Sequence, residues 1–155
     1  MISTAYNNKN ATTIIDINDI LTHLCSIKNG SILLDYKYFK PCARVENYGV
    51  ILKHIIETIQ TILHEKDTFV IHINLQSLTL SDVEKYYSFI QIISETMKNT
   101  FPDKLEQCNI YNAPFIFSQV YRIISLFIDK KTQQKMKLVE ENVDTAQVVE
   151  RVEVF

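Results

Sequence analysis

The feature that most constrains the fold is an alternation of apolar strand-like runs with amphipathic stretches between residues 68 and 139. Phe69, Ile71 and Ile73 recur at every second position, which predicts a strand over Thr68–Asn74 with these three side chains on one face. The stretch that follows repeats apolar residues at helical spacing, and a second strand is expected over Glu106–Tyr111. Strands separated by helices favour a parallel sheet with right-handed crossovers.

The remaining elements follow from caps, periodicity and turn residues. Asn29-Gly30 is expected to end a short N-terminal helix, and Ser81, with Glu84 closing a capping box, is expected to begin the helix after the Thr68–Asn74 strand. Further strands are expected over Ser31–Tyr36 and Lys135–Val139, and helices from residue 16 or 18 up to the Asn29-Gly30 stop and over residues 47–65, 81–100, 115–128 and 144–151. We therefore predict an α/β protein with a single mixed, mainly parallel sheet of about five strands flanked by helices.

Length and composition indicate a globular protein. The chain has 155 residues, of which 46% are apolar, so it can bury a core as one domain. We expect a flexible polar tail over residues 1–10 and a single domain over residues 11–155.

Charge and cysteine content argue against several classes of protein. The formal net charge is −2, so the chain lacks the basic excess of a nucleic-acid-binding protein and the polybasic attraction of a charge-held membrane protein. No apolar run is long enough to span a bilayer. Cys25, Cys42 and Cys108 have wide spacing and match no zinc pattern, so we expect reduced thiols and a cytoplasmic location.

Catalytic motifs are not found in the sequence. The four histidines, His23, His54, His64 and His72, are scattered, and His72 in a strand is typical of a hydrogen-bonded structural residue. The sequence shows neither a glycine-rich phosphate loop nor a nucleophile elbow. We expect no enzyme activity, no metal site and no cofactor other than a bound ligand.

The segment from Thr68 onward also contains motifs in a recognisable order. Phe101-Pro102-Asp103-Lys104 forms a turn after the predicted helix over residues 81–100, and Asn112-Ala113-Pro114-Phe115 precedes an aromatic helix. Asp129, Thr132 and Lys135 follow that helix at three-residue intervals. This order of parts resembles the CRAL-TRIO lipid-binding domain of the yeast phosphatidylinositol-transfer type. The resemblance implies a minimal version without the helical N-terminal subdomain, in which a gate helix closes an apolar pocket.

The resemblance assigns roles to individual residues. The lipid headgroup is expected at Lys135, Asp103 and Lys104. The pocket is expected to be lined by Phe69, Ile71, Ile73, Phe89, Ile93, Phe101, Ile110 and Phe115. The gate helix is expected to contribute Phe117, Val120, Tyr121, Ile124 and Phe127.

Two functions are therefore expected. The first is non-enzymatic binding and transfer of a hydrophobic ligand, such as a phospholipid of the phosphoinositide type, with transient contact to a membrane surface. The alternative is a protein-interaction module of the same fold with a collapsed pocket, which could be a homodimer. A helix that is apolar on nearly every side is also typical of an ordinary buried helix, so the gate residues leave both functions open.

Overall fold

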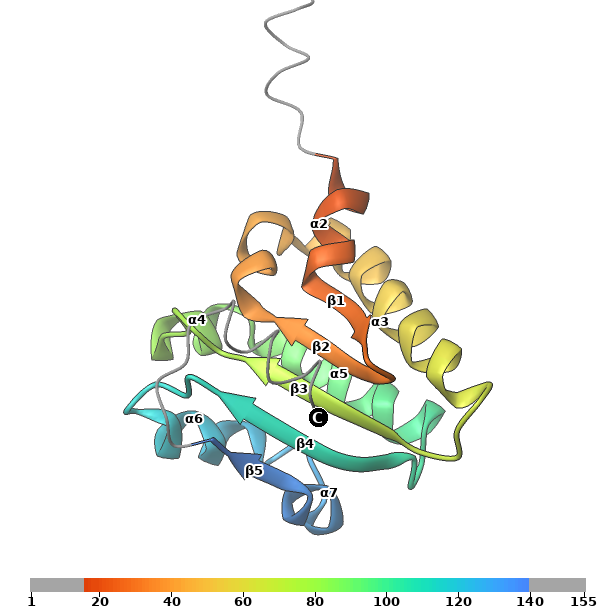
Figure 1. Ribbon diagram of the computed structural model, residues 1–155. Helices are drawn as coiled ribbons and strands as arrows, with labels where there is room; N and C mark the ends of the chain where they lie inside the picture. Colours follow the sequence, from red (N-terminus) through yellow and green to blue (C-terminus); the bar gives the residue numbers. More distant parts are fainter. Residues whose placement is uncertain (1–15, 140–155) are drawn as a thin grey trace, which may run out of the picture.

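The computed structural model describes residues 16–139, which form a five-stranded sheet with its helices gathered on one face (Figure 1). The strands follow the order of the sequence: β1 (Cys25–Lys28), β2 (Ser31–Asp35), β3 (Phe69–Asn74), β4 (Leu105–Tyr111) and β5 (Met136–Leu138). β1 is antiparallel to β2, and the other three neighbouring pairs are parallel. The prediction of a mixed, mainly parallel sheet is therefore confirmed.

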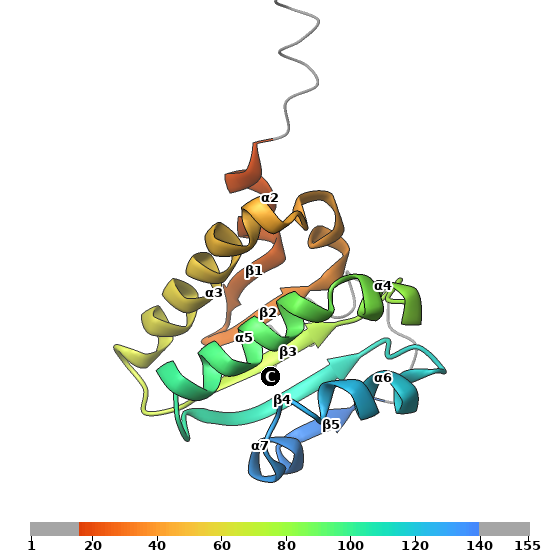
Figure 2. The same ribbon diagram turned by 180° about the vertical axis from the view of Figure 1, so that it is seen from behind.

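Helices connect the strands. They are α2 (Ile17–Leu24), α3 (Tyr48–Leu63), α4 (Leu80–Lys85), α5 (Tyr87–Thr100), α6 (Phe117–Ile124) and α7 (Lys130–Gln134). The segment between β2 and α3 contains three 3₁₀ turns: η1 (Tyr36–Tyr38), η2 (Lys40–Cys42) and η3 (Val45–Asn47). Figure 2 shows α3 and α5 lying along one face of the sheet, with α6 and α7 on the same side beneath β4 and β5.

The prediction for Asn29-Gly30 was wrong. These residues do not end α2, which stops at Leu24, but form the two-residue turn that joins β1 to β2. Both have positive φ angles, 49° and 74°, as a type I′ hairpin turn requires. β1 was missed because four residues are too short a run to show a period.

Two helix boundaries also differ from expectation. α4 is capped by Thr79, whose side chain accepts a hydrogen bond from the backbone of Asp82 while Asp82 closes the capping box, so Ser81 is not the cap. The gate helix α6 is shorter than the predicted 115–128. Its first turn begins when the Phe117 backbone N–H donates to the Pro114 carbonyl, and after Ile124 the chain continues in turns. The predicted tail over residues 1–10 and the predicted helix over 144–151 lie outside the described residues.

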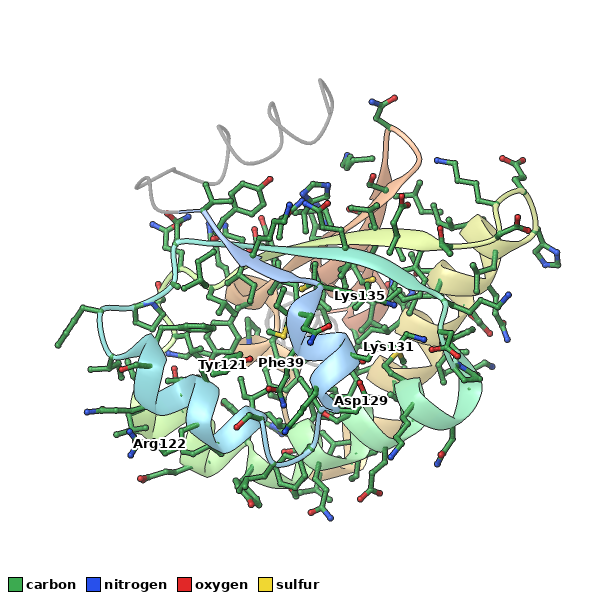
Figure 3. The ribbon with its side chains drawn as sticks, turned by 90° about the horizontal axis from the view of Figure 1, so that it is seen from below. Phe39, Tyr121, Arg122, Asp129, Lys131 and Lys135 are labelled. Atoms are coloured by element: carbon green, nitrogen blue, oxygen red, sulfur yellow. The ribbon has the colours of Figure 1, made fainter. Side chains whose placement is uncertain are left out.

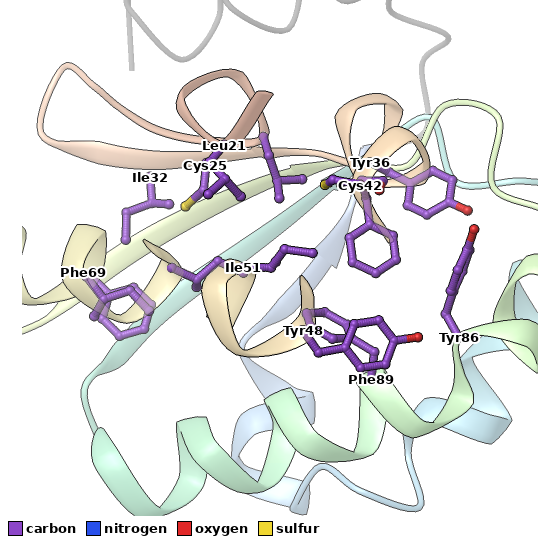
Figure 4. Close-up of a cluster of buried hydrophobic side chains, with 14 of the residues drawn as sticks. Leu21, Cys25, Ile32, Tyr36, Cys42, Tyr48, Ile51, Phe69, Tyr86 and Phe89 are labelled. Atoms are coloured by element: carbon purple, nitrogen blue, oxygen red, sulfur yellow. Dashed lines mark hydrogen bonds between the residues drawn. The ribbon is translucent and has the colours of Figure 1, made fainter. Parts of the chain in front are cut away.

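A cluster of aromatic rings occupies the space between the loop after β2, α3 and α5 (Figure 4). The Phe39 ring lies 5.0 Å from that of Tyr86 and 4.8 Å from that of Phe89, and the Tyr48 ring lies 4.9 Å from that of Phe89. Each such pair contributes about 0.5–1.5 kcal/mol beyond its burial. The cluster therefore holds the N-terminal part of α5 firmly to the rest of the molecule.

Candidate ligand-binding cavity

A cavity of about 630 Å³ lies between the sheet and the helices that cover it. Its floor is the face of the sheet that carries Leu34, Ile71, Ile73, Cys108 and Ile110. These residues share a face because side chains alternate along each parallel strand and the strands are in register. Ile71 and Ile73 are only partly buried, although they belong to a central strand, as expected for side chains that border a hollow.

Seven of the eight predicted pocket residues line this cavity: Phe69, Ile71, Ile73, Phe89, Ile93, Phe101 and Ile110. Phe115 does not, and its assignment to the pocket was wrong. Its side chain is 99% exposed and borders a separate surface depression. The reason is local: α6 begins only at Phe117, so Phe115 lies in the turn before the helix and faces solvent.

The gate residues divide into two groups. Phe117, Ile124 and Phe127 line the cavity, and the ring of Phe127 stacks edge-on against Tyr87 of α5 at 5.1 Å. Val120 and Tyr121 do not line it. Val120 is fully buried in a second core cluster, whose other buried members are Val83, Cys108, Ile110 and Phe117. Tyr121 faces α7, where its hydroxyl donates to Oε1 of Gln133 at 3.3 Å.

Gln133 is a residue that sequence reasoning missed. Its side-chain amide donates to the Ser125 carbonyl at 3.3 Å and to the Ile128 carbonyl at 2.6 Å. Together with the bond from Tyr121, these contacts join α6, the turn after it and α7. The cover of the cavity is therefore a unit of α6 and α7 and not a single helix.

Charged side chains gather where α7 and the turn before β4 meet the cavity (Figure 3). Lys135 and Asp103, both predicted headgroup residues, line the cavity here. Lys104 is exposed and is not among the lining residues, so the structure does not bring it to the other two. Sequence reasoning missed Lys98 and Lys131 at this rim, and it noted Asp129 and Thr132 in a motif without giving them a role in the site.

Short polar contacts hold the rim together. Lys131 Nζ lies 2.6 Å from Asp103 Oδ1, and Lys135 Nζ donates to the Leu105 carbonyl at 2.6 Å. The hydrogen bond and charge of Lys131 lower the pKa of Asp103, and the same pair raises the pKa of Lys131. The pKa of Asp129 is lowered by a hydrogen bond from the Thr132 backbone at the start of α7. Three lysines thus face two carboxylates, and the rim carries net positive charge.

A second polar group lines the cavity beside the aromatic cluster. Asp82 Oδ2 lies 3.0 Å from Lys40 Nζ. Burial alone would raise the pKa of Asp82, but the paired ammonium group of Lys40 and the hydrogen bond from the Thr79 backbone outweigh it and lower the pKa. Burial, with Asp82 adding to it, raises the pKa of the Tyr36 hydroxyl. This end of the cavity is thus closed by a paired charge and by rings.

The histidine and thiol near the cavity do not form a reactive pair. His72 is fully buried on the opposite face of β3, where Nδ1 lies 3.0 Å from the Tyr111 hydroxyl and burial lowers its pKa. Cys108 lines the cavity, but burial raises its pKa to about 12, so it stays a neutral thiol near pH 7.

Residues 16–139 contain neither a metal-binding cluster nor a membrane-spanning helix. Within that range no three or more His, Cys, Asp or Glu side chains cluster so as to hold a metal ion. None of the helices there has the length and apolar character needed to span a membrane.

Comparison with known sequences identifies the class of protein. The profile of the CRAL/TRIO domain matches residues 32–153, and the chain belongs to that family. It is similar to the "SEC14 cytosolic factor" of Yarrowia lipolytica, with 31% identity over 101 residues that cover 65% of this chain and 17% of the relative. It is also similar to the "Sec14 cytosolic factor" of Schizosaccharomyces pombe, with 25% identity over 114 residues that cover 74% of this chain and 34% of the relative. The chain therefore matches about a third or less of each relative.

The fold is shared with a protein of known structure. The crystal structure of Sfh5 superposes with a TM-score of 0.62 at 14% identity, covering 70% of this chain and 41% of that one. The two proteins share their fold, and at this identity the likeness extends no further.

Proposed function

We propose that this chain binds a lipid without catalysing a reaction and exchanges it with membranes. The observation that carries the proposal is an apolar cavity of about 630 Å³ bordered on one side by a positively charged rim and covered by α6 and α7. Membership in the CRAL/TRIO family supports the same function. The cytosolic factors among its relatives suit a cytoplasmic location, which we also propose.

The apolar lining can supply the affinity. Each methylene that leaves water gains about 0.8 kcal/mol, so about ten buried methylenes would offer about 8 kcal/mol, the free energy of a micromolar complex. Lys135 and Lys131 would then position an anionic head at the rim as charge-assisted hydrogen-bond donors.

Exchange requires the cover to move. α6 and α7 are joined to each other by Gln133, and to the body by the Lys131–Asp103 pair at the rim and by the packing of Val120 against Val83. They can therefore swing as one unit about the segments at residues 112–116 and 135, which is a hinge motion between two packed states. Phe115 and Leu126, 99% and 72% exposed at either end of α6, are suited to contact a bilayer surface.

The test is ligand capture by the purified chain. The chain is incubated with vesicles of mixed phospholipids and fatty acids, recovered by gel filtration and analysed by native mass spectrometry. One lipid per chain is the expected result, together with transfer of that lipid to acceptor vesicles. A folded chain that is recovered without any lipid contradicts the proposal.

The alternative, an interaction module with a collapsed pocket, is less well supported because the cavity is open space bordered by Ile71, Ile73 and Ile93. A lipid-free chain that elutes as a stable dimer in the same gel filtration would favour it. The sequence-based expectation of a phosphoinositide stays a prediction. The phosphate of a phosphoinositide suits Lys135, but the cavity would also have to hold the two acyl chains of that lipid.

A further inference from the structure

We infer that the ligand is a single-chain lipid with a small anionic head, either a carboxylate or a phosphate. The inference deepens the proposed function and depends on it. It rests on the volume of the cavity, its shape, and the position of the charged side chains along its border.

Volume is the first argument. An apolar cavity of about 150 Å³ accommodates one benzene, which has six heavy atoms, or about 25 Å³ per heavy atom. On that scale the 630 Å³ cavity has room for about 25 heavy atoms. Two acyl chains of the length found in bilayers contain roughly 36 carbons before any headgroup is counted. One chain of about 18 carbons with a compact head fits, whereas a diacyl phospholipid exceeds the space.

Shape is the second argument. The cavity runs along α5, whose Phe89, Ile93 and Met97 line it over most of the length of the helix. A helix of 14 residues is about 21 Å long. The cavity therefore extends along α5, and this extended form suits an acyl chain that lies along the helix.

The aromatic cluster in Figure 4 limits the width at one end. Phe39, Tyr86 and Phe89 line the cavity there and are each no more than 7% exposed. Their rings lie 4.8–5.0 Å apart, which is ordinary contact between aromatic side chains. A second acyl chain would have to displace rings that already stabilise the fold.

The charged rim defines the head. Lys98, Lys131 and Lys135 border the cavity near the last turn of α5 and α7, opposite the end closed by rings. Asp103 and Asp129 lie among them and leave net positive charge for one small anion. An anion at Lys135 would replace the Leu105 carbonyl as acceptor of its ammonium group.

The experiment compares four defined ligands on the purified chain by native mass spectrometry and by displacement of a fluorescent fatty acid. They are oleate, oleoyl lysophosphatidate, uncharged oleyl alcohol and dioleoyl phosphatidylinositol. We expect one of the two single-chain anions to bind with 1:1 stoichiometry and at least tenfold more tightly than the alcohol and the two-chain lipid. Whichever anion binds more tightly identifies the head as a carboxylate or a phosphate.

Each contrary outcome has a distinct meaning. Binding of the two-chain lipid as tightly as either anion overturns the single-chain inference and leaves the proposed lipid-binding function intact. Equal binding of oleyl alcohol and oleate overturns the anionic head. If none of the four ligands binds to the folded chain, the proposed function itself fails.

A chain-length series locates the ligand in the cavity. Affinity should rise about fourfold for each added methylene until the cavity is full, near 18 carbons, and then level off. Replacing Ile93, which lines the cavity, with Phe adds about three heavy atoms and should shorten the best chain by about three carbons. Ile92→Phe on the exposed side of the same helix is the matched control and should leave the optimum unchanged. If the chain length of highest affinity changes in neither variant, or changes equally in both, the placement of the acyl chain beside Ile93 is overturned.

Discussion

Lys135 has both a structural and a proposed binding role. As the C-terminal cap of α7 it borders the cavity, and its ammonium group donates to the Leu105 carbonyl at 2.6 Å. A lysine that already has a backbone acceptor is held in one position, so its charge is directed before a ligand arrives. Lys104, which sequence reasoning placed beside it, is exposed and outside the cavity.

These two lysines give a prediction at the scale of single residues. Lys135→Ala should weaken binding of an anionic lipid by about tenfold or more, because a charge-assisted hydrogen bond contributes about 1.5–3 kcal/mol. Lys104→Ala removes the same charge from an exposed position and should leave affinity within about twofold. Titration of both variants with a fluorescent fatty acid measures the difference. Equal losses in the two variants would show that only overall charge matters.

At the scale of elements, the cover of the cavity depends on α7, which the sequence did not predict. Five residues are too few to show a helical period, and Asp129 begins the helix by accepting a hydrogen bond from the Thr132 backbone at 2.7 Å. α7 then places Gln133 against the end of α6. The mobile unit that we propose is therefore held together by polar contacts and not by its aromatic residues alone.

Replacing Gln133 tests that attachment. Gln133→Ala removes the acceptor of Tyr121 and the donor to Ser125 and Ile128, and should speed ligand release by about fivefold or more because each typical hydrogen bond contributes about 1 kcal/mol. Gln134→Ala, at the exposed neighbouring position, is the control and should release ligand at the parent rate. Stopped-flow dilution of the loaded chain into excess acceptor vesicles gives both rates. An unchanged rate in Gln133→Ala would place the release step elsewhere.

At the scale of the whole molecule, three thiols report on global unfolding. Cys25 in β1, Cys42 in η2 and Cys108 in β4 are all buried, and burial raises the pKa of each thiol. For Cys25 and Cys108 the pKa reaches about 12, so neither is a reactive thiolate in the folded chain below about pH 9.

We therefore expect all three thiols to react with iodoacetamide at one slow rate that is set by unfolding, as measured by mass spectrometry of the labelled peptides. Saturating ligand at about 100 times its Kd should slow labelling by about 100-fold, because it binds only the folded chain. Between pH 9 and pH 12 the unfolded chain loses thiol protons that the folded chain retains, so the free energy of unfolding should fall as pH rises. Fast labelling of Cys108 alone in the free chain would instead indicate access through the cavity.

Most of the architecture was readable from local patterns. The alternation of Phe69, Ile71 and Ile73 predicted both a strand and the face that became the cavity floor. The Asn29-Gly30 signal was present but was assigned to a helix end, since the same left-handed geometry serves helix stops and hairpins. Phe115 was misplaced because its exposure depends on where α6 begins, a matter of one hydrogen bond to Pro114.

The sequence by itself determined the order of β2 to β5 and of the longer helices, the apolar face of the sheet and the family to which the chain belongs, because each depends on residues close together along the chain. Only the tertiary structure decided which charges gather at the rim, since Lys98, Asp103 and Lys131 come from three separate segments. It also decided the size of the hollow. A volume of about 630 Å³ is what remains after side chains from the sheet and six helices have packed against one another, and no local pattern determines it.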